Sequence, residues 1–77
     1  EQGYANAQYN LGYRYATGKG VIQDNVYAHM WWNIAASRGN KNAGKNREIL
    51  AAKMSATQIE EAQKLARKCV KKKFKGC

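Results

Sequence analysis

The chain of 77 residues contains no proline, one phenylalanine and one histidine. Because proline is absent, no stretch is barred from a helix by a missing backbone donor. No run alternates between apolar and polar residues as a half-buried strand does. The apolar runs are also too short for a membrane-spanning helix or the core of a signal peptide. These absences predict an all-α protein with no membrane span.

Side chains that could act in catalysis or bind a metal are equally scarce. His29 borders an apolar stripe, which is typical of a packed side chain rather than of a catalyst. Cys69 and Cys77 would need further ligands to hold a metal. Glu60 and Glu61 are adjacent and point in different directions on a helix, so they do not suit paired acid and base chemistry. The sequence therefore predicts no enzyme, no metal site and no bound cofactor.

Acidic residues are few, and the charge is unevenly distributed. The net charge is +9, of which residues 1–40 carry +1 (three basic, two acidic) and residues 41–77 carry +8 (eleven basic, three acidic). A basic patch can attract nucleic acid, anionic lipid or an acidic protein, and charge alone does not choose among them. A fourth interpretation is a solvated basic end that keeps a small domain in solution.

Glycine and capping residues divide the chain into four expected helices. Gly18 can close the first helix in a left-handed conformation, and Asp24 is a suitable N-cap for the second. Gly39 ends the second helix, and Ser55 and Gln58 fit a capping box at the start of the fourth. The expected helices span about residues 5–16, 25–37, 41–53 and 56–71.

Two apolar stripes predict that the first two helices pack against each other as an antiparallel pair. In the first helix Ala7, Leu11 and Tyr15 recur at helical spacing. Gly12 lies beside this stripe, where glycine costs roughly 1 kcal/mol relative to alanine, so it indicates a close helix contact. The second helix carries a matching stripe, formed by Ala28, Trp31, Trp32, Ala35 and Ala36.

The pattern of this hairpin resembles a Sel-1-like repeat, a relative of the tetratricopeptide repeats. Thirteen residues fall at the spacings of that repeat: Ala7, Leu11, Gly12, Tyr15, Gly18, Gly20, Val21, Asp24, Ala28, Trp31, Ala35, Ala36 and Gly39. The resemblance implies a short α-solenoid of stacked antiparallel helix pairs in a right-handed superhelix, with about four helices here. It also implies an adaptor or interaction module, often found in exported or signalling proteins of bacteria.

The second half of the chain matches the repeat loosely. At a shift of 36 residues, Leu11 and Gly12 align with Arg47 and Glu48. Terminal repeats of a solenoid replace their outer apolar face with polar groups, so this half is expected to act as a cap. The expected organisation is a repeat at residues 3–39, a degenerate capping helix pair at 40–72 and a basic tail at 73–77.

The two cysteines suggest a disulfide. At a shift of 34 residues, Cys69 and Val70 align with core positions of the second helix, and the segment 71–76 could fold back to bring Cys77 to Cys69. A disulfide would place the protein in an oxidising compartment, such as the bacterial periplasm or beyond. The alternative is one buried and one exposed thiol in a reducing cytoplasm.

The resemblance also indicates where a protein or peptide partner would bind. In tetratricopeptide repeats the first helix of each pair lines the concave surface. Tyrosines there give rigid contact area, asparagines can hydrogen-bond a peptide backbone and lysines can attract carboxylates. Matching the repeat positions gives Asn6, Tyr9, Tyr13 and Thr17, and the equivalents in the second pair are Asn42, Lys45, Ile49 and Lys53.

Two other functions remain open. One is a purely structural cap whose partner is its own upstream array; the other is nucleic-acid binding, which is disfavoured because the lysines and the tyrosines lie in different segments. The chain opens without methionine on a repeat-like stretch, so we expect a C-terminal fragment of a longer protein. Without upstream repeats, its first helix is expected to leave a face uncovered and to favour self-association.

Overall fold

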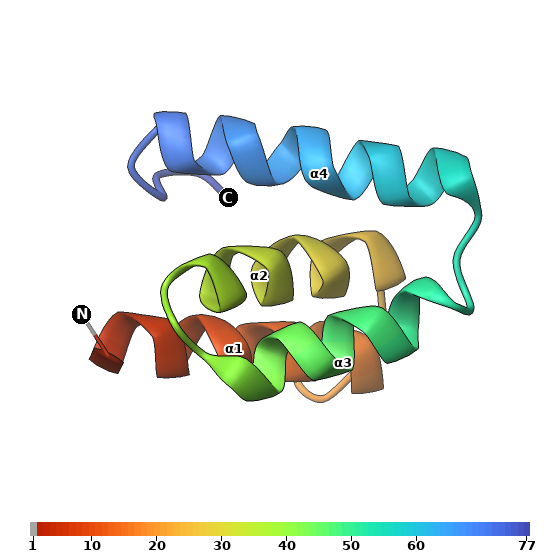
Figure 1. The fold of residues 1–77 in the computed structure, drawn as a ribbon, viewed down its shortest axis with the longest axis horizontal. Helices are drawn as coiled ribbons and strands as arrows, with labels where there is room; N and C mark the ends of the chain where they lie inside the picture. The colour runs from red at the N-terminus through yellow and green to blue at the C-terminus, as the bar shows by residue number, and fades with distance from the viewer. Residues whose placement is uncertain (1) are drawn as a thin grey trace.

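The computed structural model describes residues 2–77 and consists of four helices (Figure 1). They are α1 (Gln2–Thr17), α2 (Asn25–Ser37), α3 (Lys41–Ala51) and α4 (Ala56–Lys71). Successive helices run in opposite directions, and residues 2–77 contain no strand (Figure 1). The predicted all-α class with four antiparallel helices is confirmed, and its packing is that of a short α-solenoid.

The helix boundaries follow from the predicted local signals. The side chain of Asp24 accepts hydrogen bonds from two backbone amides in the first turn of α2, at 2.9 and 3.1 Å. Asn40 caps α3 in the same way, with one bond of 2.9 Å. Ser55 and Gln58 form a reciprocal capping box at α4, with bonds of 2.9 and 3.1 Å. Gly18, with a φ of +76°, ends α1 in the left-handed region.

The central helix of the fold is α2, which packs against all three of the others (Figure 1). We expected one buried stripe on it. The structure instead buries almost its whole circumference, because α1 and α3 lie on one side and α4 on the other (Figure 1). The buried residues are Ala28, His29, Met30, Trp31, Trp32, Ile34 and Ala35.

The contact between α1 and α2 is closest at Gly12. A Cβ atom placed on Gly12 would overlap the indole ring of Trp32. The same indole donates a hydrogen bond of 3.0 Å from its Nε1 to the backbone carbonyl of Tyr9. The predicted close approach at this glycine is therefore confirmed, and Trp32 is the side chain that requires it.

Two predicted core positions are wrong. Ala7 is exposed, whereas the buried residues of α1 are Ala5, Gln8 and Gly12. Four-residue spacing drifts by about 40° per step around a helix of 3.6 residues per turn, so the predicted stripe leaves the interface at its N-terminal end. Val70 is 51% exposed, because it follows the buried Cys69 by one position and so lies about 100° further around α4.

The second helix pair differs from the first, because α3 and α4 make few contacts with each other. The residues that align with Leu11 and Gly12 are Arg47 and Glu48, which are large and charged. The Arg47 guanidinium pairs with the Glu48 carboxylate at 3.2 Å and donates a bond of 2.8 Å to Asn33 on α2. Arg47 thus ties α3 to α2, and α4 packs on α2.

The chain reverses direction after α4 in a turn that we call the C-terminal hook, residues 72–77. Lys73 and Phe74 both adopt left-handed backbone conformations, with φ of 55° and 67°. The Phe74 amide donates a bond of 2.8 Å to the carbonyl of Cys69. A disulfide joins Cys69 to Cys77, whose Cα atoms lie 5.7 Å apart, and closes the hook.

His29 is a buried polar side chain on α2. It is 3% exposed, and its Nδ1 finds no hydrogen-bond partner within residues 2–77. Burial lowers the pKa of His29 below its usual 6.5, and the positive charge of Arg47 lowers it further, against an opposing effect of Glu48. The neutral imidazole is therefore the form that fits the folded protein, in agreement with a packing role.

This environment predicts that acid destabilises the protein. The pKa of His29 is lower in the folded state, so below about pH 6.5 the unfolded chain binds more protons and stability falls as the pH falls towards the folded pKa. Urea unfolding of the wild type at about pH 7.5 and 5.5 should show this loss, whereas His29→Leu should lack it over the same range. Equal changes in both proteins would show that another group is responsible.

Candidate functional site

A groove runs between α1 and α3, which lie side by side in one layer below α2 (Figure 1). Its volume is about 440 Å³. Trp32 of α2 contributes to the floor, α1 and α3 form the walls, and Gln23 and Asn25 at the start of α2 close one end. The side chains that determine its chemistry are Tyr13, Thr17, Trp32, Asn46, Ile49 and Lys53.

Four of the eight predicted binding residues meet in this groove. Tyr13 of α1 is 44% exposed and Ile49 of α3 is 62% exposed, so each helix contributes one large apolar surface. The Thr17 hydroxyl donates to the carbonyl of Tyr13 at 2.8 Å. Lys53, just beyond α3, is exposed and also lines the groove.

The predicted residues Asn6 and Asn42 lie in a different hollow. This second hollow has a volume of about 340 Å³ and is lined by Asn6 of α1 and by the turn from Arg38 into the start of α3. The side-chain amide of Asn40 donates a bond of 3.2 Å to the Oδ1 of Asn6. Asn6 thus contacts the N-cap residue of α3 and lies outside the groove.

The remaining two predicted residues lie in neither hollow. Tyr9 is half-buried: its ring stacks on that of Trp32, with centroids 6.4 Å apart, and its hydroxyl accepts a bond of 3.3 Å from Asn46. These contacts hold α1 against α2 and α3, so Tyr9 supports the groove from within. Lys45 is exposed on α3.

The electrostatic character of the groove is positive. Lys53 lines it, and the Nζ of Lys19 lies 5.6 Å from the centroid of the Tyr13 ring, a cation–π contact at its edge. No carboxylate lines the groove. The nearby acidic side chains have other partners, since Asp24 caps α2 and Glu48 pairs with Arg47. The groove therefore favours a ligand with negative charge.

Six residues that line the groove were not among the predicted binding residues: Ala16, Gln23, Asn25, Trp32, Asn46 and Leu50. Trp32 is predicted to lie in the core stripe, and it is buried there. It also contributes to the floor of the groove. Asn46 lies four residues after Asn42 and three before Ile49, so helical spacing places it on the same face as these two predicted residues. That spacing was a usable signal for Asn46, whereas no local signal identifies Trp32.

The described part of the chain holds no cluster of metal-ligating side chains, since no three of its His, Cys, Asp or Glu residues come together. None of its helices combines the length and the apolar character that crossing a membrane requires. The site consists of aromatic, aliphatic, amide and lysine side chains, which suit recognition of a ligand surface.

Comparison with known proteins identifies the helical hairpin. The Sel1 repeat family model matches residues 5–40, which cover most of α1, the Gly18 turn, α2 and the cap of α3. Residues 5–40 of this chain form a Sel1 repeat. Sel1 repeats are non-catalytic helical scaffolds that generally serve as protein–protein interaction modules. No curated protein and no solved structure gave a match.

Proposed function

We propose that this protein is a non-catalytic adaptor that binds an acidic peptide segment of a partner protein in the groove between α1 and α3. One observation supports this most strongly. The groove presents two exposed apolar side chains, Tyr13 and Ile49, with Lys53 and Lys19 around them and no carboxylate. An apolar surface with a cationic edge complements a peptide that has an apolar anchor beside acidic residues.

The chemistry of recognition follows from the side chains in place. Tyr13 and Ile49 would pack against the apolar anchor of the peptide, which a hollow of about 440 Å³ can accommodate. The amide of Asn46 offers hydrogen bonds to a peptide backbone. Lys53 and Lys19 would steer and pair with carboxylates, which adds specificity and a faster association rate.

The wider organisation of the molecule fits an adaptor. We take residues 3–39 as the repeat, 40–72 as the degenerate cap, whose helices α3 and α4 each pack on α2, and 73–77 as the basic tail. A purely structural cap would not require the exposed side chains of Tyr13 and Ile49 in a groove, so the adaptor function is favoured over the cap. The disulfide favours an oxidising compartment, and we propose a periplasmic or secreted location.

The proposal is tested by selecting peptides from a randomised display library on the purified protein and measuring the affinity of a selected synthetic peptide by calorimetry. Tyr13→Ala should weaken binding at least about tenfold, as expected for an aromatic anchor. The matched control is Tyr4→Ala, which removes another exposed tyrosine of α1 outside the groove and should change the affinity by less than about twofold. Selected peptides should be enriched in Asp and Glu.

Charge gives a second comparison in the same experiment. Lys53→Gln should weaken binding of the acidic peptide, and added salt should reduce the difference between this variant and the wild type. Lys64→Gln, on the exposed side of α4, removes the same charge far from the groove and should leave the affinity unchanged. Peptides without acidic enrichment, or equal losses at Tyr13 and Tyr4, would contradict the proposal.

A further inference from the structure

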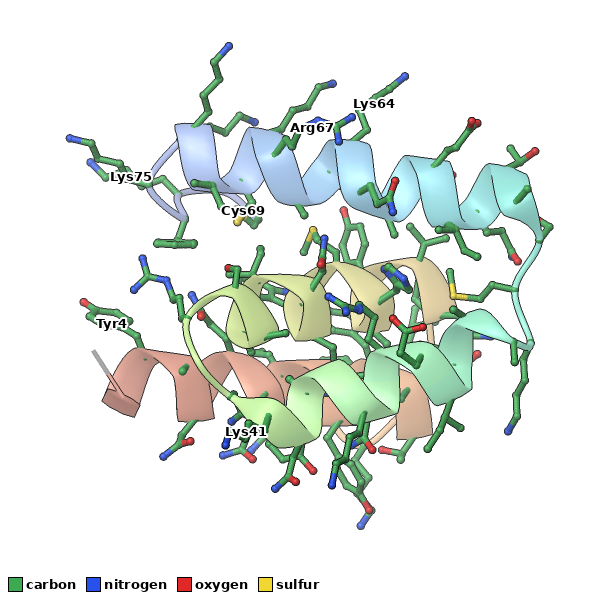
Figure 2. The ribbon with its side chains drawn as sticks, viewed as in Figure 1. Tyr4, Lys41, Lys64, Arg67, Cys69 and Lys75 are labelled. Atoms are coloured by element: carbon green, nitrogen blue, oxygen red, sulfur yellow. A yellow bond between two sulfur atoms is a disulfide. The ribbon has the colours of Figure 1, made fainter. Side chains whose placement is uncertain are left out.

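The outward side of α4 and the C-terminal hook form a continuous cationic surface, which we call the α4 basic face. Figure 2 shows Lys64 and Arg67 pointing away from α2, and Lys75 projecting from the hook. All members of this face are exposed. They are Lys64, Arg67, Lys68, Lys71, Lys72, Lys73 and Lys75.

Most of the positive charge of this face is not neutralised within the protein. Glu60 and Glu61 lie on α4 one turn before Lys64 and line the same hollow as Lys64, Arg67 and Lys68. No ion pair of the described chain joins any of the seven cations to a carboxylate, and residues 62–77 contain no Asp or Glu. Arg47 on α3 differs in this respect, since its guanidinium pairs with Glu48 at 3.2 Å. The cations at the C-terminal end of α4 and in the hook, from Lys71 onward, are therefore the most available to an external anion.

The disulfide keeps the hook lysines beside those of the helix. It joins Cys77 to Cys69, and the ring of Phe74 lies 4.6 Å beneath the guanidinium of Arg38 at the end of α2. The hook is thus attached to the body of the protein at two points. Lys72, Lys73 and Lys75 extend the row of cations on α4 instead of trailing from a free tail.

The opposite side of α4 is already occupied. Its apolar residues Ala62, Ala66 and Cys69 are buried against α2. The helix therefore cannot insert an apolar face into a bilayer, as interfacial amphipathic helices do. It can adsorb to an anionic surface through its lysines.

Three features favour a membrane surface over nucleic acid. The face has no free aromatic ring on which bases could stack, since Phe74 is covered by Arg38. From Lys64 onward there is no Asn or Gln, the side chains that read adenine edges, and no Ser or Thr. The disulfide is typical of oxidising compartments, whereas most nucleic acid is held in the reducing cytosol and nucleus.

We propose that the α4 basic face binds the surface of an anionic phospholipid bilayer by electrostatic adsorption. The groove between α1 and α3 lies on the other side of α2 from α4 (Figure 1). A protein adsorbed through α4 would hold this groove away from the bilayer. Membrane contact is thus independent of the peptide-binding function proposed above, because the two use different helices.

The test is sedimentation of the protein with vesicles of phosphatidylcholine mixed with phosphatidylglycerol, compared with pure phosphatidylcholine. Binding is expected to the mixed vesicles only, and to vanish at about 1 M NaCl, where the Debye length is about 3 Å. Each lysine near an anionic surface strengthens binding roughly fivefold, so replacing Lys64, Lys68, Lys71 and Lys72 by Gln should weaken it on the order of 100-fold or more. Emission from the buried Trp31 and Trp32 should not shift, since nothing inserts.

A variant of equal charge provides the control. Replacing Lys19, Lys41, Lys45 and Lys53 by Gln also lowers the net charge from +9 to +5, but leaves α4 intact, and it should retain most of the binding. Circular dichroism establishes that both variants fold. Equal losses in the two variants, or no binding to anionic vesicles, would overturn the proposal. Binding to duplex DNA as tight as to vesicles, per phosphate, would overturn it too and assign the face to nucleic acid.

Discussion

Replacing Gly12 with alanine is expected to lower the free energy of unfolding by about 1 to 3 kcal/mol. The new Cβ would lie 2.9 Å from the Cγ of the Trp32 indole and closer still to two other atoms of that ring. The ring cannot move aside easily, because it is buried and its Nε1 is bonded to the carbonyl of Tyr9 at 3.0 Å. In a chain this small, such a loss removes much of the stability.

The matched control is Gly44→Ala, which makes the same substitution inside α3. There the added Cβ would lie 3.7 Å from the Cβ of Ala36, an ordinary contact, so alanine should stabilise the helix by up to about 1 kcal/mol. Urea unfolding of both variants should therefore give shifts of opposite sign. Shifts of the same sign and size would mean that α1 and α2 do not touch closely at Gly12.

Removing the disulfide is expected to have the second large effect. Cys77→Ser opens the loop of eight residues and should cost about 2.5 kcal/mol on the loop-closure relation. Cys77 is the better site for the change because Cys69 is buried in the core, where substitution would also disturb packing. The measurement is thermal or urea unfolding under non-reducing conditions.

Reductant provides the control for this comparison. It should lower the stability of the wild type to that of Cys77→Ser and leave the variant unchanged. Before reduction, the intact wild type should weigh two hydrogens less than after it. A wild type that is insensitive to reductant, with both thiols free to react, would contradict the paired state of Cys69 and Cys77.

The helices could be predicted from the sequence because their signals are local. Asp24, Ser55 and Gln58 cap helices through bonds to amides two or three residues away, so their spacing carries the information. Gly12 predicted the close helix contact for a similar reason. Glycine inside a helix lowers stability, so its presence indicates that a neighbouring helix packs closely there. Each of these predictions agrees with the structure.

The packing register was harder to predict, since it depends on distant residues. The exposure of Ala7 and Val70 follows from the rotation of α1 and α4 about their own axes relative to α2. Residue spacing predicts the buried face of a helix only to within about one neighbouring position. The contact of α3 with α2 includes the bond from Arg47 to Asn33, residues 14 apart in the sequence, which no local motif predicts.

The candidate groove could be predicted in part. Repeat positions identified Tyr13, Thr17, Ile49 and Lys53, because these lie on one face of each first helix. They could not show that Tyr9 would be engaged with Asn46 and Trp32, since that contact joins three helices. The sequence thus predicts the face, and the tertiary contacts decide which of its residues are available.

The most direct test of the adaptor function is to locate a selected acidic peptide on the protein by its effect on amide chemical shifts. Our account predicts the largest changes around Tyr13, Thr17, Asn46, Ile49 and Lys53, which line the groove between α1 and α3. Amides of α4 should change little on addition of the peptide. Changes concentrated on α4, or spread evenly over the lysines, would contradict binding in the groove and with it the central claim.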